Sequence, residues 1–206
     1  MLKIWGRNNS INVQKVLWTC AELGQVFERI DCGGAFGQNR EPWYLAMNPN
    51  GLVPTIDDDG FVLWESNAIV RYLAAKHAMG TLCPADPRAR ADAERWMDWQ
   101  LTTVLPAMSP IFWGLVRTPP EKRDLGAIET ARVKLADTMI ILDRRLSTRT
   151  YVTGATFTMG DIPLGCMTYR WYALDIQRPD LPNLRRWYDR LVARTGFKTH
   201  VMLPMT

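Results

Sequence analysis

The spacing of apolar residues changes twice near the start of the chain. Residues 2–6 form a short apolar strand candidate, whereas apolar side chains after Ser10 recur at steps of three and four. This spacing predicts a helix over residues 11–23, and Gly24 is placed to end it. Residues 26–32 alternate again and predict a second strand. A strand, a helix and a strand in this order indicate a parallel pair joined by a right-handed crossover.

A second unit follows a long connection, residues 33–50, which is rich in Gly and Asn and includes a helical piece near 43–47. Two strands are predicted at 54–57 and 61–64, and Asp57-Asp58-Asp59-Gly60 between them has the turn chemistry of a hairpin. Apolar residues on one face predict a helix over 66–78. Residues 1–79 therefore predict a βαβ unit followed by a ββα unit, which is the layout of a thioredoxin-like α/β domain.

Residues 80–87 are predicted to be a proline-containing linker, and residues 88–206 show no strand pattern and predict an all-α helical-bundle domain. Pro106 and Pro110 are expected to kink or interrupt the first long helix. Thr158 is expected to cap a later helix, and Asp161 to reach back to it as in a capping box, which gives Asp161 a role in folding. The predicted helices span residues 87–116, 121–146, 160–175 and 182–195.

The most informative local pattern is a proline that opens a strand, followed at a short distance by a Glu-Ser pair that opens a helix. Pro54 cannot donate a backbone hydrogen bond, and its place after an Asn/Gly-rich loop suggests a cis Val53-Pro54 bond. A cis bond would turn the Val53 N–H and C=O outward, free to pair with an extended peptide. Glu65 and Ser66 begin a helix, where unpaired N–H groups attract carboxylates. Together these features predict a socket for a small acidic peptide.

Composition narrows the class of protein further. The 206 residues are 47% hydrophobic and 22% charged, as in ordinary globular proteins. No stretch approaches the roughly 20 apolar residues that cross a bilayer, and the N-terminus is not typical of a signal peptide, so we expect a cytoplasmic protein with no membrane partner. The net charge of +4 includes no Lys/Arg run, which does not favour a nucleic-acid partner. Four separate cysteines and two histidines predict no metal site.

The N-P-N-G-x-V-P run at 48–54, the hairpin after it and the E-S-N-A-I run at 65–69 resemble the N-terminal half of the cytosolic glutathione S-transferases, in the theta- and delta-like or bacterial serine-type branch. The order of a thioredoxin-like domain, a linker and a helical domain agrees with that family. The resemblance implies glutathione as co-substrate, no cofactor or prosthetic group, and a homodimer with helices 66–78 and 87–116 at its interface.

By this resemblance, Ser10 is the hydroxyl that activates the sulfur of glutathione. Lowering a thiol pKa by two units needs about 2.7 kcal/mol of thiolate stabilisation, and one hydrogen bond to a charged acceptor supplies roughly 1.5–3 kcal/mol. A serine at a helix start is therefore sufficient in magnitude. Two alternatives stay open: Ser10 caps the helix, or the amide of Asn12 donates to the thiolate, as in bacterial relatives that reduce disulfides.

The resemblance also implies which residues of the N-terminal domain contact each part of glutathione. The main chain of Val53 beside Pro54 would pair with the cysteinyl amide, Glu65 with the γ-glutamyl ammonium, and Ser66 with the γ-glutamyl carboxylate. The glycyl carboxylate would be reached by the loop at 38–40, through either Gln38 or Arg40. Many relatives have a lysine directly before the valine, where this chain has Leu52.

The helical domain is rich in aromatic residues that could pack in its core or line a pocket for an apolar electrophile. Met108, Phe112 and Trp113 are the best candidates for the wall of this pocket. The function that this reading favours is glutathione S-transferase activity on an apolar electrophile. The alternatives are a glutathione-dependent disulfide reductase or peroxidase, and a non-catalytic binding protein of the same fold. The other aromatic candidates are Trp96, Trp99, Tyr169, Trp171 and Tyr172.

Overall fold

A four-stranded sheet organises the N-terminal part of the chain in the computed structural model, which describes residues 1–206. β2 runs parallel to β1, whereas β3 runs antiparallel to both β1 and β4. The predicted βαβ-ββα layout is therefore confirmed. The strands lie in the order β2-β1-β3-β4 and span Leu2–Trp5 (β1), Phe27–Ile30 (β2), Thr55–Asp58 (β3) and Phe61–Trp64 (β4).

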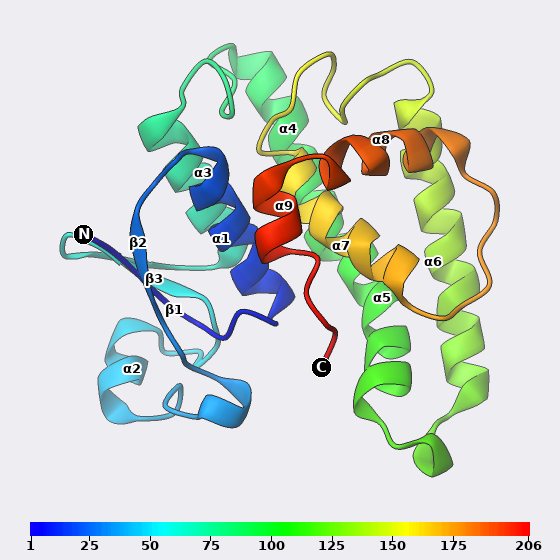
Figure 1. The fold of residues 1–206 in the computed structure, drawn as a ribbon, viewed down its shortest axis with the longest axis horizontal. Helices are drawn as coiled ribbons and strands as arrows, with labels where there is room; N and C mark the ends of the chain where they lie inside the picture. The colour runs from blue at the N-terminus through cyan, green and yellow to red at the C-terminus, as the bar shows by residue number, and fades with distance from the viewer.

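Helices α1 (Ile11–Glu22) and α3 (Ser66–His77) cover one face of the sheet, and the short α2 (Pro42–Met47) lies on the other side (Figure 1). Because side chains alternate along a strand, β1 contributes to two cores. Ile4 packs in the cluster that includes residues of α1 and α3, and Trp5 packs with Tyr44 of α2. A 3₁₀ turn, η1 (Gly34–Phe36), precedes α2.

Two local predictions in this domain are confirmed. Gly24 has φ +61° directly after α1, and the N–H of Gln25 donates to the Cys20 carbonyl at 2.9 Å, which closes the helix end. Asp59 and Gly60 both have positive φ between β3 and β4, as a two-residue hairpin loop requires. These turns depend on residue chemistry within a few positions, and the sequence therefore predicts them.

The rest of the chain is helical, as predicted, and the domain boundaries at 79 and 88 stay predictions. None of its helices combines the length and the apolar character that crossing a bilayer requires. The elements are α4 (Pro87–Trp99), η2 (Gln100–Val104), α5 (Leu105–Phe112), η3 (Trp113–Arg117), η4 (Pro120–Lys122), α6 (Leu125–Leu146), α7 (Asp161–Ala173), α8 (Pro182–Val192) and α9 (Thr195–His200).

The first long helix accommodates its prolines instead of ending at them. The segment from Pro87 to Arg117 stays helical, but η2 and η3 are π-helical turns on either side of α5. Pro106 lies in the first turn of α5, and Pro110 lies inside it. The expected interruption therefore takes the form of π-helical turns and does not end the helical segment. Such turns are a known cause of local irregularity within a helix.

The helix predicted near 182–195 is present as α8, but it is shorter than expected. α8 ends at Val192, Arg194 is extended, and α9 begins at Thr195. A Cβ on Gly196 would lie 2.9 Å from the Ala21 Cβ and 3.0 Å from the Trp18 ring, so this glycine lets α9 pack directly on α1. The packing of α9 on α1 joins the two domains, and helical periodicity does not report such a contact.

Asp161 has the predicted role in folding, but a wider one than a capping box. Its Oδ2 accepts the Thr158 N–H at 3.0 Å, whereas its Oδ1 accepts the Val152 N–H at 2.9 Å and the Trp187 Nε1–H at 2.8 Å. The prediction that the Thr158 side chain caps α7 is wrong, because Gly160 holds the N-cap position and no side chain caps it. Burial raises the pKa of Asp161 to about 6, against the effect of these donors.

α1 joins the two domains. It packs on α3 within the N-terminal domain and on α7 and α9 of the helical domain. Trp18 belongs to the large core of the helical domain and donates from Nε1 to Glu22 at 2.7 Å, and Arg194 pairs with the same carboxylate at 2.5 Å. Because α1 is fixed on both sides, its N-terminus is held at the boundary between the domains.

Candidate active site

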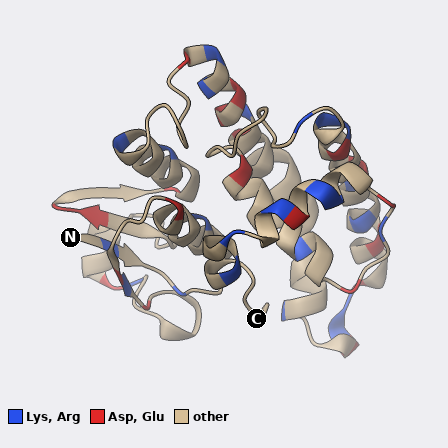
Figure 2. Ribbon diagram, turned by 45° about the horizontal axis from the view of Figure 1, so that its top comes forward, with Lys and Arg blue, Asp and Glu red and all other residues tan.

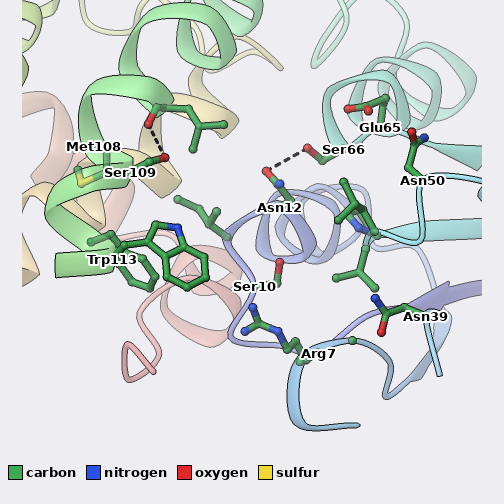
Figure 3. A pocket seen from close by; sticks show the side chains of 18 of the residues that line it. Arg7, Ser10, Asn12, Asn39, Asn50, Glu65, Ser66, Met108, Ser109 and Trp113 are labelled. Atoms are coloured by element: carbon green, nitrogen blue, oxygen red, sulfur yellow. Dashed lines mark hydrogen bonds between the residues drawn. The ribbon is translucent and has the colours of Figure 1, made fainter. Parts of the chain in front are cut away.

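A cavity of about 470 Å³ lies at this boundary (Figure 3). One wall comes from the starts of α1 and α3 and the loop before β3, and the other from α5, η3 and α7. Two of the predicted site residues, Gln38 and Arg40, do not line it. Nine do, although they come from segments far apart in sequence: Ser10, Asn12, Val53, Pro54, Glu65, Ser66, Met108, Phe112 and Trp113.

Ser10 occupies the N-cap position of α1, but its hydroxyl makes no hydrogen bond with the protein. The alternative considered from the sequence is therefore right about the N-cap position of Ser10, but its side chain makes no capping bond. The residue is only 8% exposed and faces the cavity. A buried hydroxyl without a protein partner is available to a ligand. The first N–H groups of α1 add a favourable potential for an anion at the same place.

Asn12 lies one half-turn further along α1 and contacts the start of α3. The Ser66 hydroxyl donates to Asn12 Oδ1 at 3.3 Å, as the dashed line in Figure 3 shows. The carboxamide oxygen of Asn12 is thus engaged by Ser66, and its amide nitrogen makes no hydrogen bond within the protein. The structure therefore places two donors near the start of α1, the Ser10 hydroxyl and the Asn12 amide.

The Val53-Pro54 peptide bond is cis, as predicted. Val53 lies outside the strands, and neither its N–H nor its C=O takes part in a backbone hydrogen bond. The preceding carbonyl, that of Leu52, accepts from the Tyr44 hydroxyl at 2.6 Å and from Asn48 Nδ2 at 2.8 Å. Sequence reasoning missed this support, although Asn48 opens the motif on which the resemblance is based.

Glu65 and Ser66 open α3 in an unusual backbone conformation. Glu65 has φ +72°, a value that residues other than glycine rarely adopt, and its carboxylate forms no ion pair. Ser66 is buried at the first position of the helix. Positive φ at a residue with a side chain clusters at ligand sites, where the surroundings hold the residue in place. An acid and a helix N-terminus therefore stand side by side at one end of the cavity (Figure 3).

Lys15 is a charged residue that sequence reasoning missed. It is fully buried, and its Nζ donates to Gln100 Oε1 at 2.8 Å, Asn67 Oδ1 at 3.2 Å and Ser66 Oγ at 3.4 Å. No carboxylate pairs with it. Burial lowers the pKa of Lys15 to about 8, Cys166 and Glu65 raise this pKa, and Arg170 lowers it further. The sequence signal was a lysine among apolar residues of a helix that has two buried faces.

The opposite wall carries the aromatic residues expected there. Phe112 is buried, Trp113 is 62% exposed at the edge of the cavity, and Met108 lies one turn earlier on the same helix. Core packing explains the other aromatic candidates, none of which lines the cavity. Trp96 and Trp171 belong to the large helical core, and Trp99, Tyr169 and Tyr172 pack against it.

The loop at 38–40 brings a different residue to the cavity than expected. Asn39 lines it and donates from Nδ2 to the Gly51 carbonyl at 2.7 Å. Gln38 is exposed, and the exposed Arg40 donates to the Asn50 carbonyl at 3.3 Å. The assignment of Gln38 or Arg40 to the glycyl carboxylate stays a prediction. No three His, Cys, Asp or Glu side chains are grouped as metal ligands.

Comparisons with known proteins agree with this geometry. Residues 9–76 match the family model described as the glutathione S-transferase N-terminal domain, and residues 126–190 match that of the C-terminal domain. The chain is 44% identical to glutathione S-transferase GstB of Escherichia coli, over 100% of both proteins. It is 31% identical to glutathione S-transferase 3 of Zea mays, over 99% of this chain and 95% of that protein.

A solved structure is similar along the whole chain. It is that of the theta class glutathione S-transferase from Xanthomonas axonopodis pv. citri with glutathione bound, with a TM-score of 0.96 and 47% identity over 100% of this chain and 99% of that one. Sequence identity and fold agree across both domains, and the chain therefore belongs to the glutathione S-transferase family.

Proposed function

We propose that the protein is a glutathione S-transferase that binds glutathione in the cavity between its domains and activates the thiol at the start of α1. The observation that carries this proposal is the Ser10 hydroxyl, which faces the cavity without a protein partner. It shares that cavity with the unpaired main chain of Val53 and with the Glu65-Ser66 helix start. Glutathione offers a complementary group to each of these features: its thiol to Ser10, its cysteinyl amide to Val53, and its γ-glutamyl ammonium and carboxylate to the start of α3.

The γ-glutamyl end fits the start of α3. Its ammonium would pair with Glu65. Its carboxylate would accept from the first N–H groups of the helix and from the Ser66 hydroxyl, whose proton would turn from Asn12 Oδ1 to the ligand. Lys15 lies directly behind Ser66 at 3.4 Å and lacks a carboxylate partner. A buried cation is costly without a counter-charge, and we infer that the ligand's carboxylate supplies this charge.

The cysteinyl residue would pair with the main chain of Val53, which directs the sulfur toward Ser10. A free thiol has a pKa of about 8.5, so only a few per cent is ionised at neutral pH. The Ser10 hydroxyl and the N-terminus of α1 both favour the thiolate, which would attack an electrophilic carbon of the co-substrate. The glycyl carboxylate would lie near the loop at 38–40, where Gln38 and Arg40 are the predicted contacts and Asn39 is a further one.

The co-substrate would place an apolar body against Met108, Phe112 and Trp113. The test is calorimetry with glutathione together with conjugation of chlorodinitrobenzene. We expect binding at or below millimolar concentration and thioether formation above the uncatalysed rate. Absence of glutathione binding at millimolar concentration would refute the proposal and favour a non-catalytic protein of the same fold.

A second candidate activity is glutathione-dependent disulfide reduction or peroxide reduction. The observation that favours it is the free amide of Asn12 near Ser10, which offers a donor other than a hydroxyl. No cysteine lines the cavity, so the protein would supply no thiol of its own. Bis-hydroxyethyl disulfide and chlorodinitrobenzene, assayed side by side, separate the two activities by their ratio.

We also propose a cytoplasmic homodimer. The interface would include α3 and α4, and exposed apolar side chains at Phe61, Val62 and Leu101 give a surface that association would cover. The four cysteines are buried and unpaired, as in proteins of a reducing compartment. Light scattering of the purified protein tests the dimer, and a monomer at micromolar concentration would contradict it.

A further inference from the structure

Three arginines line the cavity, and the glutathione scheme above uses none of them. Arg7 comes from the loop after β1, Arg117 from the last position of η3, and Arg170 from α7. Arg170 is only 9% exposed, and its guanidinium carbon lies 3.8 Å from the centre of the Phe112 ring. That of Arg117 lies 5.8 Å from the same ring centre. The guanidinium groups of Arg170 and Arg117 thus lie beside the aromatic wall on which a co-substrate would pack, and Arg7 lines the cavity next to the start of α1.

None of these guanidinium groups is neutralised by the protein. The nine ion pairs of the chain include neither Arg7, Arg117 nor Arg170. Arg7 donates to the uncharged Asn9 Oδ1 at 2.6 Å, and Arg170 makes no hydrogen bond to the protein. Buried charges are usually paired, and buried donors usually have acceptors. Arg170 is thus a largely buried residue of the cavity lining whose five donors have no protein acceptor, which suits an anionic ligand.

The positive charges of the three arginines repel one another. The pKa of Arg170 is lowered to about 10, mainly by burial; Cys166 acts in the opposite direction, and the charges of Arg117 and Arg7 contribute to the lowering. Burial also lowers the pKa of Arg7, again with a contribution from Arg117. The only acidic residue on the cavity wall is Glu65, which Figure 3 shows at the far end beside Ser66, away from Arg7 and Trp113. An anion near Phe112 would relieve this repulsion.

The arginines are not part of a generally basic face. Basic and acidic segments are interspersed over both domains in Figure 2, and the net charge of the chain is only +4. A mixed surface of this kind places no strong single-sign field over the molecule. The concentration of unpaired positive charge is therefore a property of the cavity itself.

We propose that the co-substrate is an electrophile that carries a carboxylate, with its apolar body on Phe112 and Trp113 and its carboxylate on the guanidinium groups of Arg170 and Arg117. This inference rests on the proposed transferase function and refines its substrate class. A guanidinium group offers a planar fork that matches a carboxylate in two parallel hydrogen bonds. Arg7, next to the start of α1, would face the reacting end.

The reaction on a carboxylated aryl halide balances without another reactant. The thiol of glutathione loses its proton to solvent, and the thiolate sulfur forms a bond with the carbon that bears the halogen. The carbon–halogen bond breaks, and halide leaves with the bonding pair. The carboxylate is unchanged and serves only for recognition.

The test compares 4-chloro-3,5-dinitrobenzoate with its methyl ester, which has the same reacting carbon and ring but no charge. Each kcat/KM is divided by the uncatalysed rate constant with glutathione, so that the different reactivity of the two compounds cancels. A charged hydrogen bond contributes roughly 1.5–3 kcal/mol, and we therefore expect the enzyme to prefer the acid by about tenfold to a hundredfold.

Arg117→Met should reduce this preference about tenfold, with a much smaller effect on the ester. Arg117 is exposed, so its replacement does not endanger folding. Arg170→Lys retains the charge but not the fork and should lower the acid rate more than the ester rate. Arg149→Met removes one exposed charge that does not line the cavity and should leave the preference intact.

Three results would overturn the inference. If the native enzyme conjugates the ester as well as the acid, the cavity does not select a carboxylate, although the proposed function stands. If both rates fall equally in the Arg117 and Arg170 variants, these arginines serve the thiolate and not the co-substrate. If neither compound is conjugated and glutathione does not bind, the proposed function fails, and the inference fails with it.

Discussion

Replacing Ser10 with alanine tests the donor that the proposed mechanism needs. Serine-to-alanine changes at a helix N-cap commonly cost about 1 kcal/mol because a capping bond is lost. Ser10 makes no such bond. We therefore expect the free energy of unfolding to change by less than about 0.5 kcal/mol, as for substitutions that break no specific interaction. The change thus removes a ligand contact and little else.

The size of the catalytic effect follows from the missing donor. A hydrogen bond from a hydroxyl to a thiolate is worth roughly 1.5–3 kcal/mol, and each pKa unit corresponds to about 1.4 kcal/mol. The pKa of the bound glutathione thiol should therefore rise by about one to two units in Ser10→Ala. At neutral pH, kcat/KM should fall by about tenfold to a hundredfold. The affinity for glutathione should change little, because the interaction is made mainly with the charged sulfur.

The assay is a pH titration of the ultraviolet absorbance of the thiolate in the enzyme–glutathione complex, followed by steady-state kinetics with chlorodinitrobenzene. Ser10→Thr retains a hydroxyl and should keep most of the thiolate. Asn12→Ala removes the alternative donor and the 3.3 Å contact with Ser66, and should affect glutathione affinity more than the thiol pKa. An unchanged thiol pKa in Ser10→Ala, together with a raised one in Asn12→Ala, would refute the assignment of Ser10.

Three further predictions concern charges that the structure buries or leaves free. Lys15→Met should weaken binding of S-methylglutathione at pH 7 and abolish its decline above pH 8. The pKa of Lys15 is about 8 in the free protein. A bound carboxylate favours protonated Lys15, so above pH 8 binding must take up a proton and becomes weaker as the pH rises. Equal pH profiles for variant and native protein in calorimetry would contradict this. Asp161→Ala leaves the donors of Val152, Thr158 and Trp187 unsatisfied and should lower the free energy of unfolding by about 3 kcal/mol or more, since each costs about 1–3 kcal/mol. Denaturant titration measures it, and a loss below about 1 kcal/mol speaks against the reasoning. Glu65→Gln should raise the KM for glutathione about tenfold, as expected for one lost charged hydrogen bond, with kcat nearly unchanged; an unaltered KM would remove Glu65 from the site.

Local chemistry in the sequence determined the thioredoxin-like domain. Gly24 ends α1 because a glycine adopts positive φ at no steric cost, and the same reason places the hairpin at Asp59-Gly60. The cis bond before Pro54 and the helix start at Glu65 follow from residue types within a few positions of one another. Signals of this kind need no knowledge of distant segments, and together with the family resemblance they indicated nine of the 21 residues that line the cavity.

The tertiary structure alone decided which polar groups are free. Ser10 is a residue type that commonly caps helices, yet its hydroxyl faces a cavity that the helical domain helps to enclose. Lys15 is buried because α1 packs on two domains at once, which apolar periodicity on one face does not predict. Gly196 lies inside α9 and lets this helix pack closely on α1, a contact between distant segments.

The charge of the second-substrate pocket shows the same division. Arg7, Arg117 and Arg170 are separated by more than fifty residues at each step of the sequence, and each alone is typical of a solvated surface. They line one cavity because the loop after β1, the end of η3 and part of α7 all border it. Secondary structure depends on neighbours along the chain and was therefore predictable, whereas burial and charge pairing depend on neighbours in space, which only the packing of the two domains brings together.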